Sequence, residues 1–132
     1  RETGEFVVNL TTEELARATD LCGVISGRDV NKWEAAGLTP VPARKVKAPL
    51  IGECPVNLEC RVEQELALGS HILFLARVVS VSVDEAYLDE KGSLHLDWAK
   101  PICYSHGRYF PLGKEIGKFG FSVAKKRAER KR

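Results

Sequence analysis

The segment 23–33 (GVISGRDVNKW) combines residue types that bind an anion. Its two glycines permit left-handed backbone or close approach to a ligand, and Arg28 and Lys32 add positive charge. Asp29 is a suitable N-cap for a short helix that ends near Gly37. Free N–H groups at the start of a helix attract phosphate. The segment predicts a phosphate-binding loop, although an ordinary capped turn between two helices explains the same residues.

The four cysteines show no spacing typical of a metal site or a redox motif. They are Cys22, Cys54, Cys60 and Cys103, and none forms Cys-x-x-Cys or a zinc-type pair with histidine. Cys60 lies on the apolar face of an expected strand and Cys22 on a helix face. We therefore predict no metal ligands and buried, reduced thiols, which fits a cytoplasmic protein.

Alternating apolar residues predict the strands that must position the loop. Residues 5–10 form one such strand, and 56–66 alternate so regularly that one face, with Glu59, Arg61, Glu63 and Glu65, is expected to be solvated. The run 71–83 is apolar on both faces at first and then β-branched, and its length suggests a bulge. Weaker patterns at 94–104, 107–112 and 117–124 complete the expected sheet, with His95 facing outward.

Helical signals are confined to the first third of the chain. Thr11 and Glu14 form a capping-box pattern ahead of a helix that runs to about Cys22. The proline-rich segment 38–55 predicts a surface wrap with at most a short edge strand. Long consecutive strands with few helices indicate an antiparallel Greek-key β-barrel with peripheral helices.

Length and charge limit the class of protein. The 132 residues suffice for one domain, which we expect over 1–126, and the net charge is +2. Residues 125–132 hold six cations and one acid, so the remainder carries −3. We expect 127–132 to be a basic, disordered tail. No apolar run has membrane-spanning length, and no basic stripe with interleaved aromatics indicates nucleic-acid binding.

Four segments in order resemble the flavin reductase-like family of FMN-binding split barrels, and most closely its flavoredoxin branch. They are residues 2–10, 26–33, 69–74 and 107–123. The resemblance implies a split-barrel flavoprotein and oxidoreductase that binds FMN and transfers electrons as a homodimer. It also implies a reductant, NADH or NADPH or a redox partner protein. Family members have further strands before this point, so we expect N-terminal strands to be missing.

The resemblance also implies roles for individual residues. The cofactor-binding positions are Ser26, Gly27, Arg28, Lys32, Trp33 and Tyr109. Trp33 either covers the phosphate end or packs in the core. His71 and His106 correspond to positions near the nicotinamide or substrate, but Ser70 replaces the family's aspartate. A hydrogen-bonded histidine at a strand end and an exposed hairpin tip are the alternatives for these two. No catalytic residue is assigned.

Two other functions remain compatible with the sequence. One is a degenerate split-barrel dimer that has lost its flavin. The other is a cofactor-free β-barrel binding module. Electron transfer by bound FMN requires no catalytic triad, because the isoalloxazine ring carries the redox chemistry and the protein binds and orients it.

Overall fold

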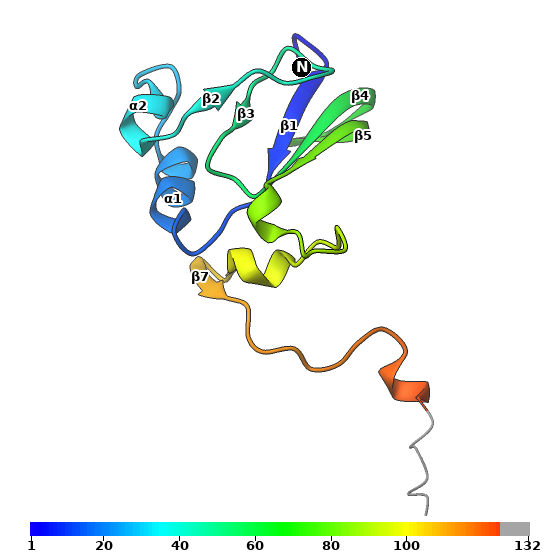
Figure 1. Ribbon diagram of the computed structural model, residues 1–132. Coiled ribbons are helices and arrows are strands. Elements are labelled where there is room, and N and C mark those ends of the chain that lie inside the picture. Colours follow the sequence, from blue (N-terminus) through cyan, green and yellow to red (C-terminus); the bar gives the residue numbers. More distant parts are fainter. Residues whose placement is uncertain (125–132) are drawn as a thin grey trace, which may run out of the picture.

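A three-stranded antiparallel sheet forms the centre of the computed structural model, which describes residues 1–124 (Figure 1). Its strands are β1 (Glu5–Asn9), β4 (Val56–Leu68) and β5 (His71–Val83), with β4 in the middle. The strands predicted over 5–10, 56–66 and 71–83 are confirmed. Period-two alternation and β-branched residues specify them locally, so the sheet was predictable from the chain itself.

The long β4–β5 hairpin contains two shifts of register. One lies between Glu59 and Cys60, where Val79 of β5 has no partner, and the other between Val62 and Gln64. The bulge predicted from the length of 71–83 is therefore confirmed. Bulges bend a strand and increase its twist, which is how a hairpin with two strands of 13 residues departs from a flat ribbon.

The face of β4 predicted to be solvated is buried along the first half of the strand. Asn57 is 6% exposed and Glu59 is 0% exposed, whereas Arg61, Glu63 and Glu65 are exposed as predicted. The segment between the helices and β4 folds over this face. It contains β2 (Pro40–Val41) and β3 (Leu50–Ile51), which pair with each other. The predicted wrap is present, but it holds two short paired strands where at most one short edge strand was expected.

Helix α1 (Ala16–Val24) begins later than the capping box predicts. The Thr11 hydroxyl is hydrogen-bonded to the Thr19 hydroxyl at 2.5 Å, and Leu15 precedes the helix without a side-chain cap. The preceding residues are held elsewhere, because Thr12 bridges Pro101 and the Glu13 N–H donates to the Lys100 carbonyl. A long-range contact thus overrides the local capping signal.

The C-terminal third forms short 3₁₀ turns and a hairpin rather than further strands of the central sheet. Strand β6 (Ile102–Ser105) pairs with β7 (Arg108–Pro111), so the strand expected from 94 starts only at 102. His95 is not an outward strand residue: its ring is hydrogen-bonded to Asp89 at 2.8 Å and stacks on Trp98.

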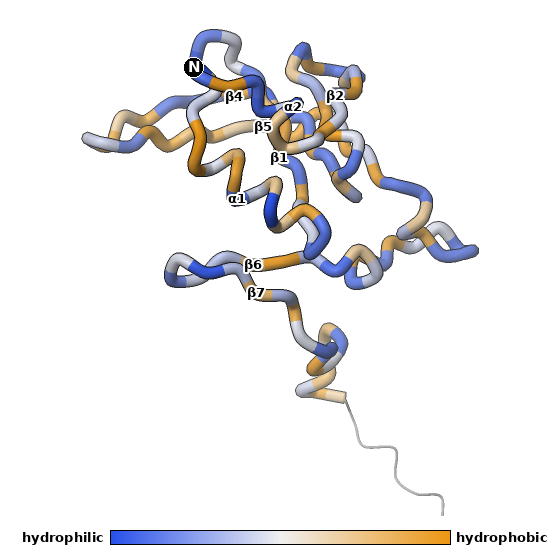
Figure 2. The backbone as a smooth tube through the Cα atoms, turned by 90° about the vertical axis from the view of Figure 1, so that its left-hand side faces the viewer, coloured by the Kyte–Doolittle hydropathy of each residue, from blue (hydrophilic) through white to orange (hydrophobic). Residues whose placement is uncertain are grey.

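The segment 117–124 does not close the sheet. It contains a 3₁₀ turn at Phe121–Val123 and leads away from the sheets in both views (Figures 1 and 2). Glycines at 117 and 120 interrupt any alternation there, and glycine is a poor strand former. The expected boundary at 126 and the tail 127–132 lie outside the described residues.

The thiols differ in exposure. Cys54 and Cys60 are buried as predicted, Cys22 is half-buried, and Cys103 is exposed, so the prediction was wrong for Cys103. Over residues 1–124, no helix has the length and apolarity needed to cross a membrane.

Candidate functional site

Asn31, not Asp29, caps the second helix. Helix α2 (Lys32–Ala36) is five residues long, and the Asn31 side-chain oxygen accepts a hydrogen bond from the Trp33 N–H at 3.1 Å. Asp29 lies in a turn in which its own N–H donates to the Ser26 carbonyl. Gly37 adopts φ +66° and ends the helix as predicted.

Lys32 is the first residue of α2, and its ammonium reaches back to α1. The Lys32 Nζ donates to the Cys22 carbonyl at 2.6 Å, where α1 leaves carbonyls unpaired. A cation at this end also interacts favourably with the helix dipole. Lys32 therefore has a structural contact that the sequence did not indicate.

The other loop residues form a solvent-exposed turn. The Ser26 hydroxyl accepts from the Arg28 N–H at 3.2 Å, and the Arg28 side chain forms no ion pair within the described part of the chain. Neither Gly23 nor Gly27 has the positive φ that we considered; Gly23 lies inside α1. Trp33 is half-buried, so its exposure does not distinguish covering the phosphate end from packing in the core.

Tyr109 contacts helix α1 from the C-terminal part of the chain. Its hydroxyl donates to the Asp20 carboxylate at 3.2 Å, and its ring packs edge-on against Tyr104 at 5.2 Å. Partial burial, followed by the Asp20 charge and hydrogen bond, raises the pKa of the Tyr109 phenol. Asp20 and Cys22 are two residues apart in α1, so this helix connects Tyr109 to the loop.

The two candidate histidines lie at the tips of different hairpins. His71 is exposed at the β4–β5 turn, and its Nδ1 is hydrogen-bonded to the Ser70 hydroxyl at 2.8 Å. His106 is exposed at the β6–β7 turn with φ +49°. Both geometries agree with the strand-end and hairpin-tip alternatives.

An apolar groove lies between α1 and the segment that wraps over the sheet. Its volume is about 200 Å³, which is below the roughly 300–1,000 Å³ of a typical small-molecule site. No pattern in the sequence indicates this groove, since its lining comes from four separate segments. The lining residues are Asn9, Thr11, Leu15, Ala18, Thr19, Cys22, Leu38, Ile51 and Cys54.

The family model of the flavin reductase like domain matches residues 1–113, which is most of the chain. The chain belongs to the flavin reductase like family. An uncharacterized protein of Archaeoglobus fulgidus is 42% identical over 95 residues, covering 72% of this chain and 54% of that protein. The family assignment made from four segments is therefore confirmed.

Two solved flavoredoxin structures have a similar fold. The flavoredoxin of Desulfovibrio vulgaris (Miyazaki F) is 27% identical, with a TM-score of 0.84, over 93% of this chain and 67% of that one. The flavoredoxin of Methanosarcina acetivorans is 29% identical, with a TM-score of 0.80 and the same coverage.

A third structure identifies the fold as the split barrel. A flavin reductase of Shewanella frigidimarina, described as putative and as having a split barrel domain, is 18% identical, with a TM-score of 0.74. It is matched over 88% of this chain and 60% of that one. The mainly β split-barrel fold class is confirmed. This member of the flavin reductase like family spans about half to two thirds of the length of the proteins it matches.

Proposed function

We propose that this chain is part of an FMN-binding, flavoredoxin-like electron-transfer protein. The observation that most strongly supports this proposal is the similarity of the chain to two flavoredoxins over 93% of its length. Electrons would enter from NADH, NADPH or a redox protein and leave to an acceptor. The proposed location is the cytoplasm, which the four free thiols support.

The loop residues are suited to the phosphate end of FMN. The Arg28 guanidinium, the Ser26 hydroxyl and the Lys32 ammonium are the types of donor that a phosphate dianion accepts. Arg28 is exposed, and a Cβ at Gly27 would lie 3.6 Å from the Cε atom of Lys32, so Gly27 lies against the end of the Lys32 side chain. Bound FMN would supply the redox chemistry, while these residues would hold its phosphate.

The aromatic and histidine residues have separate proposed roles. Trp33 and Tyr109 would flank the cofactor, because half-buried aromatic rings can stack on a planar ring system. His71 and His106 would contact the nicotinamide or substrate, and their exposure leaves both rings accessible. An effect of His71→Ala on the KM for NADH without a change in FMN affinity would support this division.

Paired flavin titrations test the phosphate site. Lys32→Ala should weaken FMN binding by about 10- to 150-fold, since a charge-assisted hydrogen bond contributes about 1.5–3 kcal/mol. Riboflavin, which has no phosphate, should lose little affinity. Arg28→Gln should show the same selectivity without touching the Cys22 carbonyl, which Lys32 contacts. Lys91→Gln, in a distant exposed turn, is the matched control.

The outcomes distinguish the alternatives. Equal losses of FMN and riboflavin affinity in Lys32→Ala would mean that Lys32 acts by capping the C-terminal end of α1 and not by binding the phosphate. If the wild-type chain binds neither flavin, the degenerate split-barrel protein without cofactor replaces the present proposal.

A further inference from the structure

Four consecutive backbone N–H groups, from Arg44 to Lys47, all donate to carboxylates of the central sheet. Glu59 accepts from Arg44 at 3.2 Å, from Lys45 at 2.6 Å and from Val46 at 3.2 Å. Glu5 accepts from Lys47 at 2.9 Å. We call residues 44–47 the basic loop.

Two further contacts fix the position of the basic loop. The Arg61 guanidinium donates to the Lys45 carbonyl at 2.6 Å and lies 3.6 Å from the Glu5 carboxylate, its cross-strand neighbour. The Val46 side chain is buried at 7% exposure and anchors the loop on the sheet. The backbone is thus held from below by side chains of β1 and β4.

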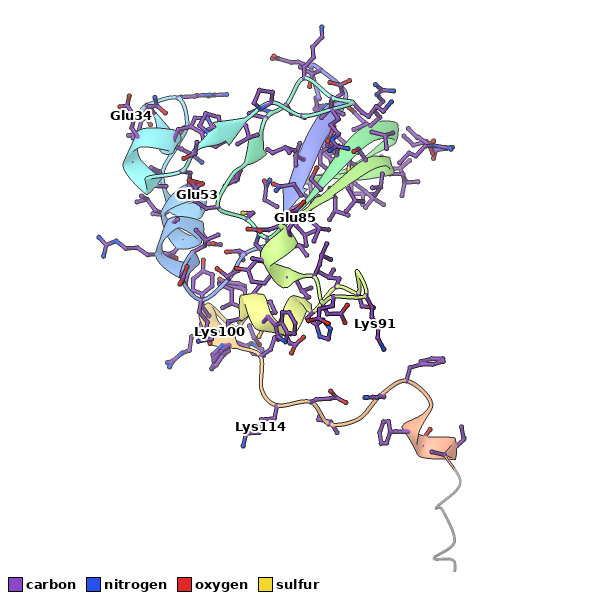
Figure 3. The ribbon with its side chains drawn as sticks, viewed as in Figure 1. Glu34, Glu53, Glu85, Lys91, Lys100 and Lys114 are labelled. Atoms are coloured by element: carbon purple, nitrogen blue, oxygen red, sulfur yellow. The ribbon has the colours of Figure 1, made fainter. Side chains whose placement is uncertain are left out.

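The side chains of the basic loop are oriented differently from its backbone. Arg44, Lys45 and Lys47 are exposed, and none of the ion pairs found across residues 1–124 includes them. Three cations within four residues are therefore presented to solvent on a fixed backbone. Figure 3 shows that other lysines, including Lys91, Lys100 and Lys114, lie in the lower part of the molecule, away from β1 and β4.

The basic loop contrasts with the rest of the described chain. Removing residues 125–132 from the totals of 20 cationic and 18 acidic side chains leaves 14 and 17, a net charge of −3. The whole chain carries +2, so the contrast holds within residues 1–124. A positive patch on this net-negative part attracts an acidic surface there and repels it elsewhere, which orients the encounter. A preorganised loop also loses little conformational entropy on binding.

We propose that the basic loop is a docking surface for a protein with an acidic surface. A nucleic acid is less suited, because residues 40–53 contain no aromatic side chain on which bases could stack. The inference rests on the proposed function, in which a redox protein is one of the possible electron donors or acceptors, but its test requires no flavin.

The test measures the binding of fluorescein-labelled poly-L-glutamate by fluorescence anisotropy, at about 25 mM and about 200 mM salt. The substitution Arg44→Gln/Lys45→Gln/Lys47→Gln should weaken binding at low salt by about tenfold. The matched control Lys91→Gln/Lys100→Gln/Lys114→Gln removes the same charge and should weaken it less than about twofold. Equal losses in the two variants, or no binding by the wild type, would overturn the proposal.

Two further variants test whether binding depends on the fixed position of the basic loop or only on the charge of the protein. Glu59→Gln makes the protein more positive and keeps all three cations, so net charge alone predicts tighter binding. Because Glu59 holds the loop, we expect binding to weaken instead. Val46→Ala, which changes no charge and removes the buried anchor, should weaken binding in the same direction and decides the matter if Glu59→Gln does not fold. Unchanged or tighter binding in Val46→Ala would contradict a positioned loop.

Two control ligands identify the class of partner. A single-stranded oligo-dT that binds more tightly than poly-L-glutamate, with the same dependence on the basic loop, would overturn the protein partner in favour of a nucleic acid. An equal loss of FMN affinity in the triple basic-loop variant would instead place the loop in the flavin site. Retained FMN affinity with lost poly-L-glutamate binding is the result expected.

Discussion

Glu59 is an acidic residue in full burial, and its hydrogen bonds explain how the fold tolerates it. Burial favours the neutral acid, but the N–H groups of Lys45, Arg44 and Val46, together with the Ser80 hydroxyl, outweigh it. The net effect is that the pKa of the Glu59 carboxyl is lowered. Glu59 is therefore ionised in the folded protein and links the wrapping segment to β4.

Glu59 should make stability depend on acid pH. Its pKa is lower in the folded than in the unfolded chain, so the folded state binds fewer protons. Its contribution is present above the unfolded pKa of about 4.3 and is lost as the pH falls through the folded value. Urea unfolding from pH 6 to pH 3 should show a smaller acid loss in Glu59→Gln than in the wild type. Parallel pH profiles would contradict this role.

The buried and exposed cysteine thiols should differ in reactivity. Burial, with the nearby Glu53 charge, raises the pKa of the Cys54 thiol to about 11, and burial raises that of Cys60. The thiolate is the reactive form, so Cys103, which is exposed, should be alkylated by iodoacetamide well before Cys54. Peptide mass spectrometry of the native protein at pH 8 gives the order. Early modification of Cys54 would show that its segment opens readily.

At the scale of elements, α2 shows how a short helix depends on its ends. It has five residues, Asn31 at its start and Gly37 in left-handed conformation at its end. An isolated helix of this length is unstable in water, so its capping bonds and its contact with α1 through Lys32 maintain it. The candidate phosphate loop therefore depends on these same contacts.

Substitution of the cap tests this dependence. Asn31→Ala should lower the free energy of unfolding by about 1 kcal/mol, since it removes the side-chain bond to the Trp33 N–H. Asp29→Ala, two residues earlier, should change it by less than about 0.5 kcal/mol. Chemical denaturation of the two variants beside the wild type provides the comparison, and a larger effect at Asp29 would restore the cap predicted from the sequence.

At the scale of the whole molecule, large apolar side chains are exposed on several elements. Figure 2 shows hydrophobic segments along the β4–β5 hairpin and the C-terminal part of the described chain. On the outer half of the hairpin, the exposed residues are Leu66, Leu68, Leu73, Phe74 and Leu75. The register places the four leucines on one face of the hairpin and Phe74 on the other. Exposed apolar surface of this kind is typical of a protein interface.

The exposed hairpin should take part in self-association. We expect sedimentation velocity at about micromolar concentration to show a homodimer, because apolar surface is removed from water on association. Leu68→Lys, at a side chain that is 61% exposed, should shift the equilibrium toward monomer with little loss of monomer stability. The same change at exposed Val41, which lies outside the hairpin, is the control. A stable wild-type monomer would refute the dimer.

Local patterns in the sequence determined the elements whose signals are local. Strands β1, β4 and β5 follow from alternation, the bulge from the length of 71–83, and the end of α2 from Gly37. Four short segments also sufficed to assign the family, because their residue types and order are characteristic together. Each of these inferences depends on neighbours within a few residues.

Tertiary structure decided the features that depend on contacts between distant segments. Alternation assigns Glu59 to a wet face, but the wrapping segment, 13 to 15 residues earlier, covers it and supplies three N–H donors. In the sequence Lys32 resembles a free phosphate ligand, but in the folded chain its ammonium is hydrogen-bonded to the Cys22 carbonyl. Tyr109 is hydrogen-bonded to Asp20, which lies 89 residues earlier. Burial and charge pairing arise from such long-range packing, so single-residue patterns do not encode them.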